Sequence, residues 1–149
     1  MEGVFYVLDI KAPIIPWVGL GSIKLYESIN NLRWLVDQDY VKASIFSRYL
    51  VRYELPDKIY LFFNILNGKL FKLTALKGYE GVLLDRIKIG MTSEELLRID
   101  PSFVYEDFEE VYVSEKGVFI ETDAGTEEIM WISVFIKELE TPEFMKAEW

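Results

Sequence analysis

Two stretches of the chain repeat one pattern of hydrophobic and polar positions. Residues 22–36 read SIKLYESINNLRWLV, and residues 86–100 read RIKIGMTSEELLRID. Each begins with apolar residues at alternate positions, which predicts a short strand with one apolar face. Each continues with a hydroxyl residue, Ser28 or Thr92, followed by apolar residues three positions apart. That order predicts a short helix with a hydroxyl N-cap.

The second helix carries the stronger start and stop signals. Glu95 follows Thr92 by three positions, as in a capping box, and Pro101 ends the helical pattern. Asn31 occupies the corresponding slot after Ser28, which is a weaker version of the same signal. We expect both helices to be short.

Hydrophobic, β-branched and aromatic runs follow both helices. Asn67–Gly68 is the strongest hairpin signal in the chain, and Lys116–Gly117 and residues 124–126 are predicted turns. The predicted strands cover residues 3–10, 47–55, 58–66, 69–76, 109–115, 117–123 and 128–136.

These elements predict an α+β fold with a mostly antiparallel sheet. Apart from the leading strand, residues 1–76 and 85–136 form two β-α-β-β-β-like halves, each with one short helix. One half alone cannot cover the apolar face of its sheet, so we expect the halves to share a core within a single domain, residues 1–149. An internal duplication explains the repeat, and residues 137–149 form a C-terminal tail.

Composition narrows the possible chemistry. The 149-residue chain has no cysteine and no histidine. These absences exclude disulfides, thiolate zinc sites, cysteine nucleophiles, Ser-His-Asp hydrolysis and HExxH zinc proteases. The longest apolar run, residues 59–66, is too short for a membrane span, and the N-terminus has no signal-peptide pattern. We expect a soluble cytoplasmic protein without a cofactor.

Charge is distributed unevenly along the chain. Residues 1–75 hold nine Lys/Arg and seven Asp/Glu, a net charge of +2, whereas residues 76–149 hold seven and 18, a net charge of −11. Such a field repels nucleic acid and anionic lipid and attracts a basic partner. The alternative is a solvated acidic face that only keeps an aromatic-rich protein soluble.

The segment EDFEE, residues 106–110, places four acids around Phe108. An aromatic residue among acids can anchor a basic partner, because the ring supplies contact energy and the charges steer its approach. The other interpretation is that Phe108 fills the core. Glu121 and Asp123 form a second acidic pair, which could hold a divalent cation or share acid–base chemistry, or could simply be exposed beside a turn.

Two resemblances follow from these segments. IKIGMTSEELLRIDPSF is similar to the strand-turn-helix opening of small outer-membrane assembly lipoproteins, although the lipid-bearing cysteine of that family is absent. The whole chain also resembles bacterial immunity proteins of polymorphic-toxin and contact-dependent inhibition systems. The shared features are a small, acidic, aromatic-rich α+β protein without histidine or cysteine, and segments such as EEVYVSEKGVFIETD and IMWISVFIKEL. That resemblance implies a non-catalytic protein that covers the active site of one cognate toxin domain, often a nuclease with a basic cleft.

The resemblance and the charge pattern together select a set of acidic residues and one aromatic residue as the expected partner-binding surface. They are Asp107, Phe108, Glu109, Glu110, Glu121, Asp123, Glu127 and Glu128. The alternatives are a small-ligand-binding or enzymatic α+β domain with a pocket between the halves, and a structural or regulatory module. No metal, nucleic acid or membrane partner is expected.

Overall fold

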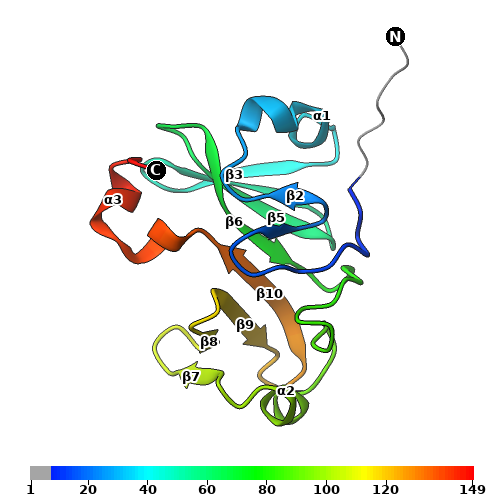
Figure 1. Cartoon of the computed structure of the whole chain (residues 1–149). Coiled ribbons are helices and arrows are strands. Elements are labelled where there is room, and N and C mark those ends of the chain that lie inside the picture. The colour runs from blue at the N-terminus through cyan, green and yellow to red at the C-terminus, as the bar shows by residue number, and fades with distance from the viewer. Residues whose placement is uncertain (1–7) are drawn as a thin grey trace.

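A computed structural model of the chain describes residues 8–149 (Figure 1). Most of the strand predicted for residues 3–10 lies outside the described residues. The fold is α+β and its main sheet is antiparallel, as predicted. Eight strands form this sheet in the order β3-β4-β5-β6-β10-β9-β8-β7, and β1 and β2 form a separate two-stranded ribbon.

The strand bounds agree with the sequence predictions for six strands and differ for the rest. Both β3 and β7 were missed, so each helix precedes four strands rather than three. The strand expected at Ile87 is not regular, because Ile87 forms one isolated bridge to Leu83. The strands are β1 (Gly19–Leu20), β2 (Ile23–Lys24), β3 (Lys42–Ser47), β4 (Leu50–Leu55), β5 (Ile59–Asn64), β6 (Lys69–Ala75), β7 (Val104–Glu106), β8 (Val111–Ser114), β9 (Val118–Thr122) and β10 (Ile129–Phe135).

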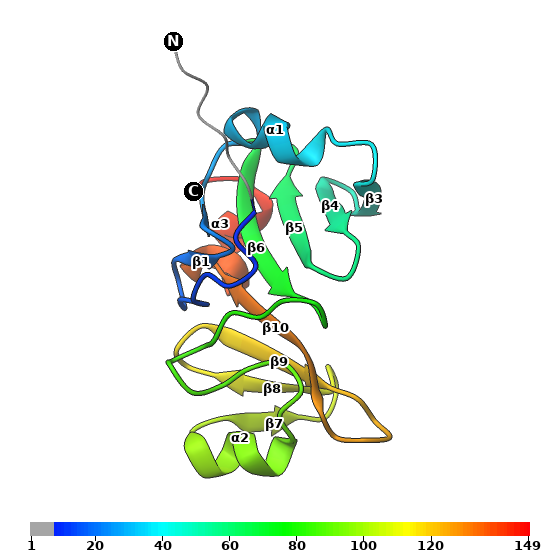
Figure 2. The same cartoon turned by 90° about the vertical axis from the view of Figure 1, so that its right-hand side faces the viewer.

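Both predicted helix caps are present. Ser28 accepts a hydrogen bond from the Asn30 N–H, and a 3₁₀ turn (η1, Ile29–Leu32) leads into α1 (Arg33–Val36). Thr92 and Glu95 form a complete capping box at the start of α2 (Ser93–Ile99). Figures 1 and 2 show α1 and α2 at opposite ends of the molecule.

The core is one connected cluster of buried apolar side chains that extends across both halves of the sheet. Leu35 of α1, Leu73 of β6, Ile132 of β10 and Leu96 of α2 all belong to it. The antiparallel pairing of β6 with β10 joins the halves at the centre of the sheet, with Leu73 opposite Val134.

The C-terminal tail packs on the body of the protein. After β10 the chain forms a 3₁₀ turn (η2, Lys137–Glu140) and a short helix (α3, Pro142–Met145). Phe144 is 5% exposed, and its ring centre lies 4.8 Å from that of Phe71 and 5.8 Å from that of Trp149, which stacks on it. The Phe71 and Trp149 ring centres are 6.4 Å apart, so the three rings form one cluster. The tail therefore contributes to the core.

Candidate functional site

The β7–β8 turn projects Phe108 into solvent. Its side chain is 89% exposed, which makes it the most exposed large hydrophobic residue of the described chain. The carboxylate of Glu106, at the end of β7, accepts hydrogen bonds from the Phe108 N–H (3.2 Å) and the Glu109 N–H. Glu110 has a positive φ of 57° and turns the chain into β8. The turn therefore holds Phe108 outward on a fixed backbone, which excludes the interpretation that Phe108 fills the core.

A second acidic turn, residues 123–128, connects β9 to β10. Oδ1 of Asp123 accepts hydrogen bonds from Gly125 N–H (2.8 Å) and Thr126 N–H (3.0 Å), which hold the pKa of Asp123 below its ordinary value. The Ser93 N–H, in the first turn of α2, donates to the Glu127 carbonyl at 2.9 Å. Asp123 thus organises its own turn, and α2 fixes that turn in place.

The sheet register brings the two turns to the same end of the sheet. β8 begins beside the end of β9, since Tyr112 pairs with Ile120, and β9 ends opposite the start of β10, where Thr122 pairs with Ile129. Figure 2 shows both turns on the same side of this half of the molecule. The exposed members of the predicted set are Asp107, Phe108, Glu109, Glu110, Glu127 and Glu128.

Glu121 differs from the other predicted residues because it lies half-buried on β9. Burial is the main cause that raises the pKa of its carboxyl group; the positive charge of Lys72 acts to lower it, and the negative charge of Glu109 raises it further. Glu109 in the tip and Glu121 on the strand therefore share one electrostatic environment. Nearby, partial desolvation and then the charges of Glu110 and Asp107 raise the pKa of the Tyr105 phenol.

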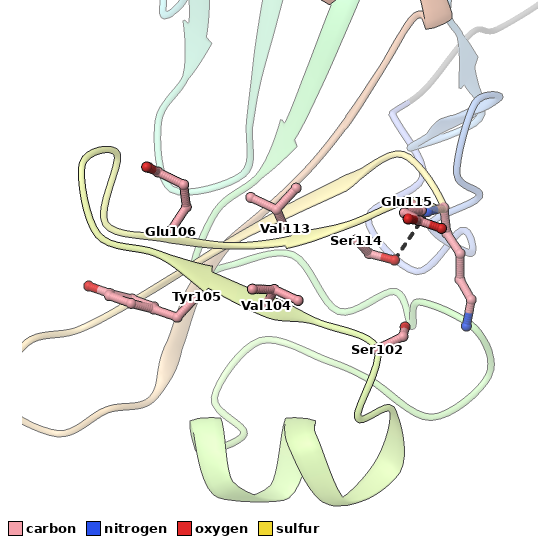
Figure 3. Close-up of a pocket in the computed structure, with 8 residues that line it drawn as sticks. Ser102, Val104, Tyr105, Glu106, Val113, Ser114 and Glu115 are labelled. Atoms are coloured by element: carbon pink, nitrogen blue, oxygen red, sulfur yellow. Dashed lines mark hydrogen bonds between the residues drawn. The ribbon is translucent and has the colours of Figure 1, made fainter.

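A hollow of about 590 Å³ lies along β7 and β8, next to the acidic tip (Figure 3). Val104 of β7 and Val113 of β8 lie opposite each other in it, and Val104 is 67% exposed. Sequence reasoning missed this surface because three residues of β7 give too short an alternation to recognise. The lining residues are Ser102, Val104, Tyr105, Glu106, Val113, Ser114, Glu115 and Lys116.

Lys72, where the halves meet, was also missed. Its Nζ lies 4.9 Å from the ring centre of Phe62 and 5.8 Å from that of Phe119, and no carboxylate of the described residues forms a salt bridge with it. Burial lowers the pKa of this ammonium group, and the charges of Glu121 and then Glu109 act in the opposite direction. Its sequence neighbours, LFKLT, give no sign of this environment.

Two further observations concern metal ions and membranes. Among residues 8–149, no group of three or more Asp or Glu side chains is arranged to hold a metal ion. In the same part of the chain, none of the helices has the length and apolar character required to cross a bilayer.

Comparisons with known proteins give a structural match and no match in sequence. No protein-family model and no curated protein matches the chain. The fold is similar to the crystal structure of a cysteine-rich secretory protein from Staphylococcus aureus, with a TM-score of 0.51 and 16% sequence identity. The match covers 89% of this chain and 49% of that one, so the chain spans about half the length of the secretory protein. At this identity the likeness concerns the fold alone.

Proposed function

We propose that the chain is a non-catalytic binding protein that presents the acidic β7–β8 tip to a basic protein partner. The observation that carries the proposal is the 89% exposure of Phe108 on a turn whose backbone is fixed by Glu106. When a partner binds, an aromatic ring held in solvent has a large apolar area removed from water. Because its backbone is already fixed, it loses little conformational entropy, and both effects favour a contact hot spot.

The surrounding charges supply the second part of the proposal. Asp107, Glu109 and Glu110 flank the ring, and Glu127 and Glu128 project from the same end of the sheet. Acids at this density speed the encounter with a basic surface, and the effect weakens with salt. We therefore expect fast, salt-sensitive association rather than turnover of a substrate.

The specific partner proposed is a bacterial toxin domain with a basic, phosphate-binding active site, which the acidic tip would cover. The chain would then act as an immunity protein in the cytoplasm of the cell that makes it. The resemblance to such proteins in composition supports this form of the proposal, and the presented aromatic ring within an acidic surface fits it.

The proposed internal duplication gains support from the topology. A short capped helix precedes a four-stranded antiparallel meander in each half, and the last strands, β6 and β10, pair with each other at the centre. We infer that one ancestral unit was copied, after which the second copy acquired the acidic turns.

The test begins with the tagged full chain as bait in a lysate of its source cell at low salt. Captured proteins are identified, purified and assayed for their own activity with and without the chain. The proposal expects a basic protein, bound one to one and inhibited by the chain. A captured protein whose activity the chain leaves unchanged would contradict inhibition.

Two charge-reversal variants then locate the surface. The test variant replaces Asp107, Glu109 and Glu110 with Lys; the matched control replaces Glu140, Glu143 and Glu148, three exposed acids of the tail, with Lys. Both change the net charge by the same amount. Association should slow strongly in the first variant and remain near wild type in the second. Equal effects would show that overall charge, and not the tip, governs binding.

A small anionic ligand bound at the junction of the halves is the second candidate function. The observation that favours it is the Lys72 ammonium between two aromatic rings. Arg52 of β4, one strand beyond β5, also has a buried Nε with no hydrogen-bond partner among the described residues. Phenyl phosphate should raise the melting temperature of the wild type and not that of Lys72→Met if this site binds anions. An equal response of the two proteins would exclude it.

A further inference from the structure

The strand at the other end of the sheet, β3, is open along its whole length. It pairs with β4 on one side and is the first strand in the sheet order, so no described strand pairs with its other side. Figure 2 shows β3 at the outer end of its half of the molecule. All six of its residues are exposed, and Ile45 is 72% exposed.

β3 has few of the features that keep edge strands from pairing. Natural edge strands carry charges, prolines or bulges that block further hydrogen bonding. β3 contains a single charged residue, Lys42, at its start, and no proline. Its register irregularity falls between Ile45 and Ser47, so residues 42–45 remain regular. An exposed apolar strand of this kind is a template for another strand.

The charge distribution favours a strand from a second copy of the chain as the one that pairs with β3. The acidic turns lie in the β7–β10 half, which follows β6 in the strand order counted from β3, whereas residues 1–75 carry a net charge of only +2. Two copies of an acidic protein can therefore approach each other through β3 while their acidic turns stay far apart. Approach through the β7 side would instead bring the acidic turns together.

We propose that two copies of the chain pair through β3, antiparallel and about a two-fold axis, so that the eight-stranded sheet continues across the interface. An isologous contact of this type closes after two copies, which is the commonest arrangement of homo-oligomers. The proposal is independent of the function proposed for the acidic tip.

The sequence of β3 suits a two-fold axis at Ser44. Side chains directly opposite each other in an antiparallel pair lie on the same face of the sheet, so Ala43 meets Ile45 of the second copy within the regular residues 42–45. The small Ala43 leaves room for Ile45, and with the axis at Ser44 the Lys42 residues of the two copies do not face each other. No like charges are opposed. A single strand pair buries less than a standard interface, so we expect a dissociation constant on the order of 10 µM.

Sedimentation equilibrium on the full chain tests the proposal, at concentrations on either side of about 10 µM. The wild type should rise from the monomer mass of 17.5 kDa to twice that value and no further. Ile45→Lys should stay monomeric with an unchanged circular dichroism spectrum and melting temperature. Val104→Lys, which places the same charge on the exposed edge strand β7, is the matched control and should dimerise like wild type.

Three results would overturn the proposal: a wild type that stays monomeric, an Ile45→Lys variant that still dimerises, or a mass that grows beyond two copies. Amide hydrogen exchange gives an independent measurement. Exchange within residues 42–47 should slow as the wild-type concentration rises, and should be independent of concentration in Ile45→Lys. Concentration-independent exchange in the wild type would also overturn it.

Discussion

Lys116 Nζ lies 2.8 Å from Oδ2 of Asp100, which ties the β8–β9 turn to the residue that ends α2. Ser102 donates to the other oxygen, Oδ1, through its N–H (3.1 Å) and its hydroxyl (2.6 Å). The Lys116 hydrogen bond, followed by that of Ser102, holds the pKa of Asp100 below its ordinary value. The side chain of Asp100 is 11% exposed, so its charge is satisfied by these partners more than by water.

We expect Asp100→Asn to lower the free energy of unfolding by about 1–3 kcal/mol at neutral pH, because it weakens charge-assisted hydrogen bonds to a buried group. Since the pKa is depressed in the folded state, the carboxylate stabilises above the pKa of the unfolded chain, and this contribution is lost as the pH falls through the lower folded value. Urea unfolding should therefore show a difference between the two proteins that narrows below about pH 4. Asp107→Asn, at an exposed site, is the control and should match wild type.

The caps, turns and central strands of this fold could be predicted from the sequence, but the edge strands β3 and β7 could not. The capping box at Thr92, the turn at Gly117 and the bounds of the central strands follow from neighbouring residues. β3 has no buried face, so its residues show no alternation, and β7 has only three residues. Such strands exist because they pair with neighbouring strands, and this pairing is visible only in the structure.

The candidate site was predictable to the same extent. Turn residues and acids marked the β7–β8 tip, and the exposure of Phe108 excludes the interpretation that its ring fills the core. The environment of Lys72 depends on Phe62, ten residues earlier in the chain, and on Phe119, 47 residues later, brought together by strand pairing. No pattern among neighbouring residues predicts contacts of this kind.

Phe108→Ala should leave the fold unchanged and weaken partner binding. A side chain that is 89% exposed contributes little to the core, so the free energy of unfolding should change by less than about 0.5 kcal/mol. If the ring is a hot spot, affinity for the captured partner should fall about 30-fold or more, which corresponds to about 2 kcal/mol. Surface plasmon resonance on the purified pair measures this loss. Unchanged affinity would remove Phe108 from the interface.

Phe144→Ala should destabilise the protein although it lies near the C-terminus. The ring packs against both Phe71 and Trp149 and is 5% exposed, so its removal leaves a cavity and should cost about 3–5 kcal/mol. Chemical denaturation measures the loss. Met145→Ala, at a neighbouring position that is 47% exposed, is the control and should have a small effect. Equal small effects would mean that the tail is not part of the core.

The phenol of Tyr79 joins the N-terminal loops to the linker. Its hydroxyl donates to the Ala12 carbonyl (2.5 Å) and accepts from the Gly21 N–H (2.7 Å). Tyr79→Phe leaves these two groups without that partner and should cost about 1–3 kcal/mol. Burial raises the pKa of Tyr79 to about 12, so the folded state keeps this proton while the unfolded state loses it from about pH 10 upward. The difference between the two proteins in urea should therefore narrow between pH 10 and 12, and a constant difference would contradict this.

Lys72→Met should leave stability unchanged or raise it by up to a few kcal/mol at neutral pH. Met has a similar length, packs well against the rings of Phe62 and Phe119, and removes the cost of burying a charge that has no salt bridge among the described residues. The sign of the pH dependence follows from the lowered pKa of Lys72. Between that value and the unfolded value of about 10.4, the unfolded state binds more protons, so wild type gains stability as the pH rises through this window.

Lys72→Met lacks that gain, and its advantage over wild type should shrink toward pH 10. Tyr79 titrates in both proteins, so its contribution cancels in the difference. Urea unfolding at several alkaline pH values measures this difference in the free energy of unfolding. Lys58→Met is the control, because the Lys58 side chain is 40% exposed. A loss of more than about 1 kcal/mol in Lys72→Met at neutral pH would show that attraction to Glu121 outweighs the cost of burial, and that this ammonium stabilises the junction of the two halves.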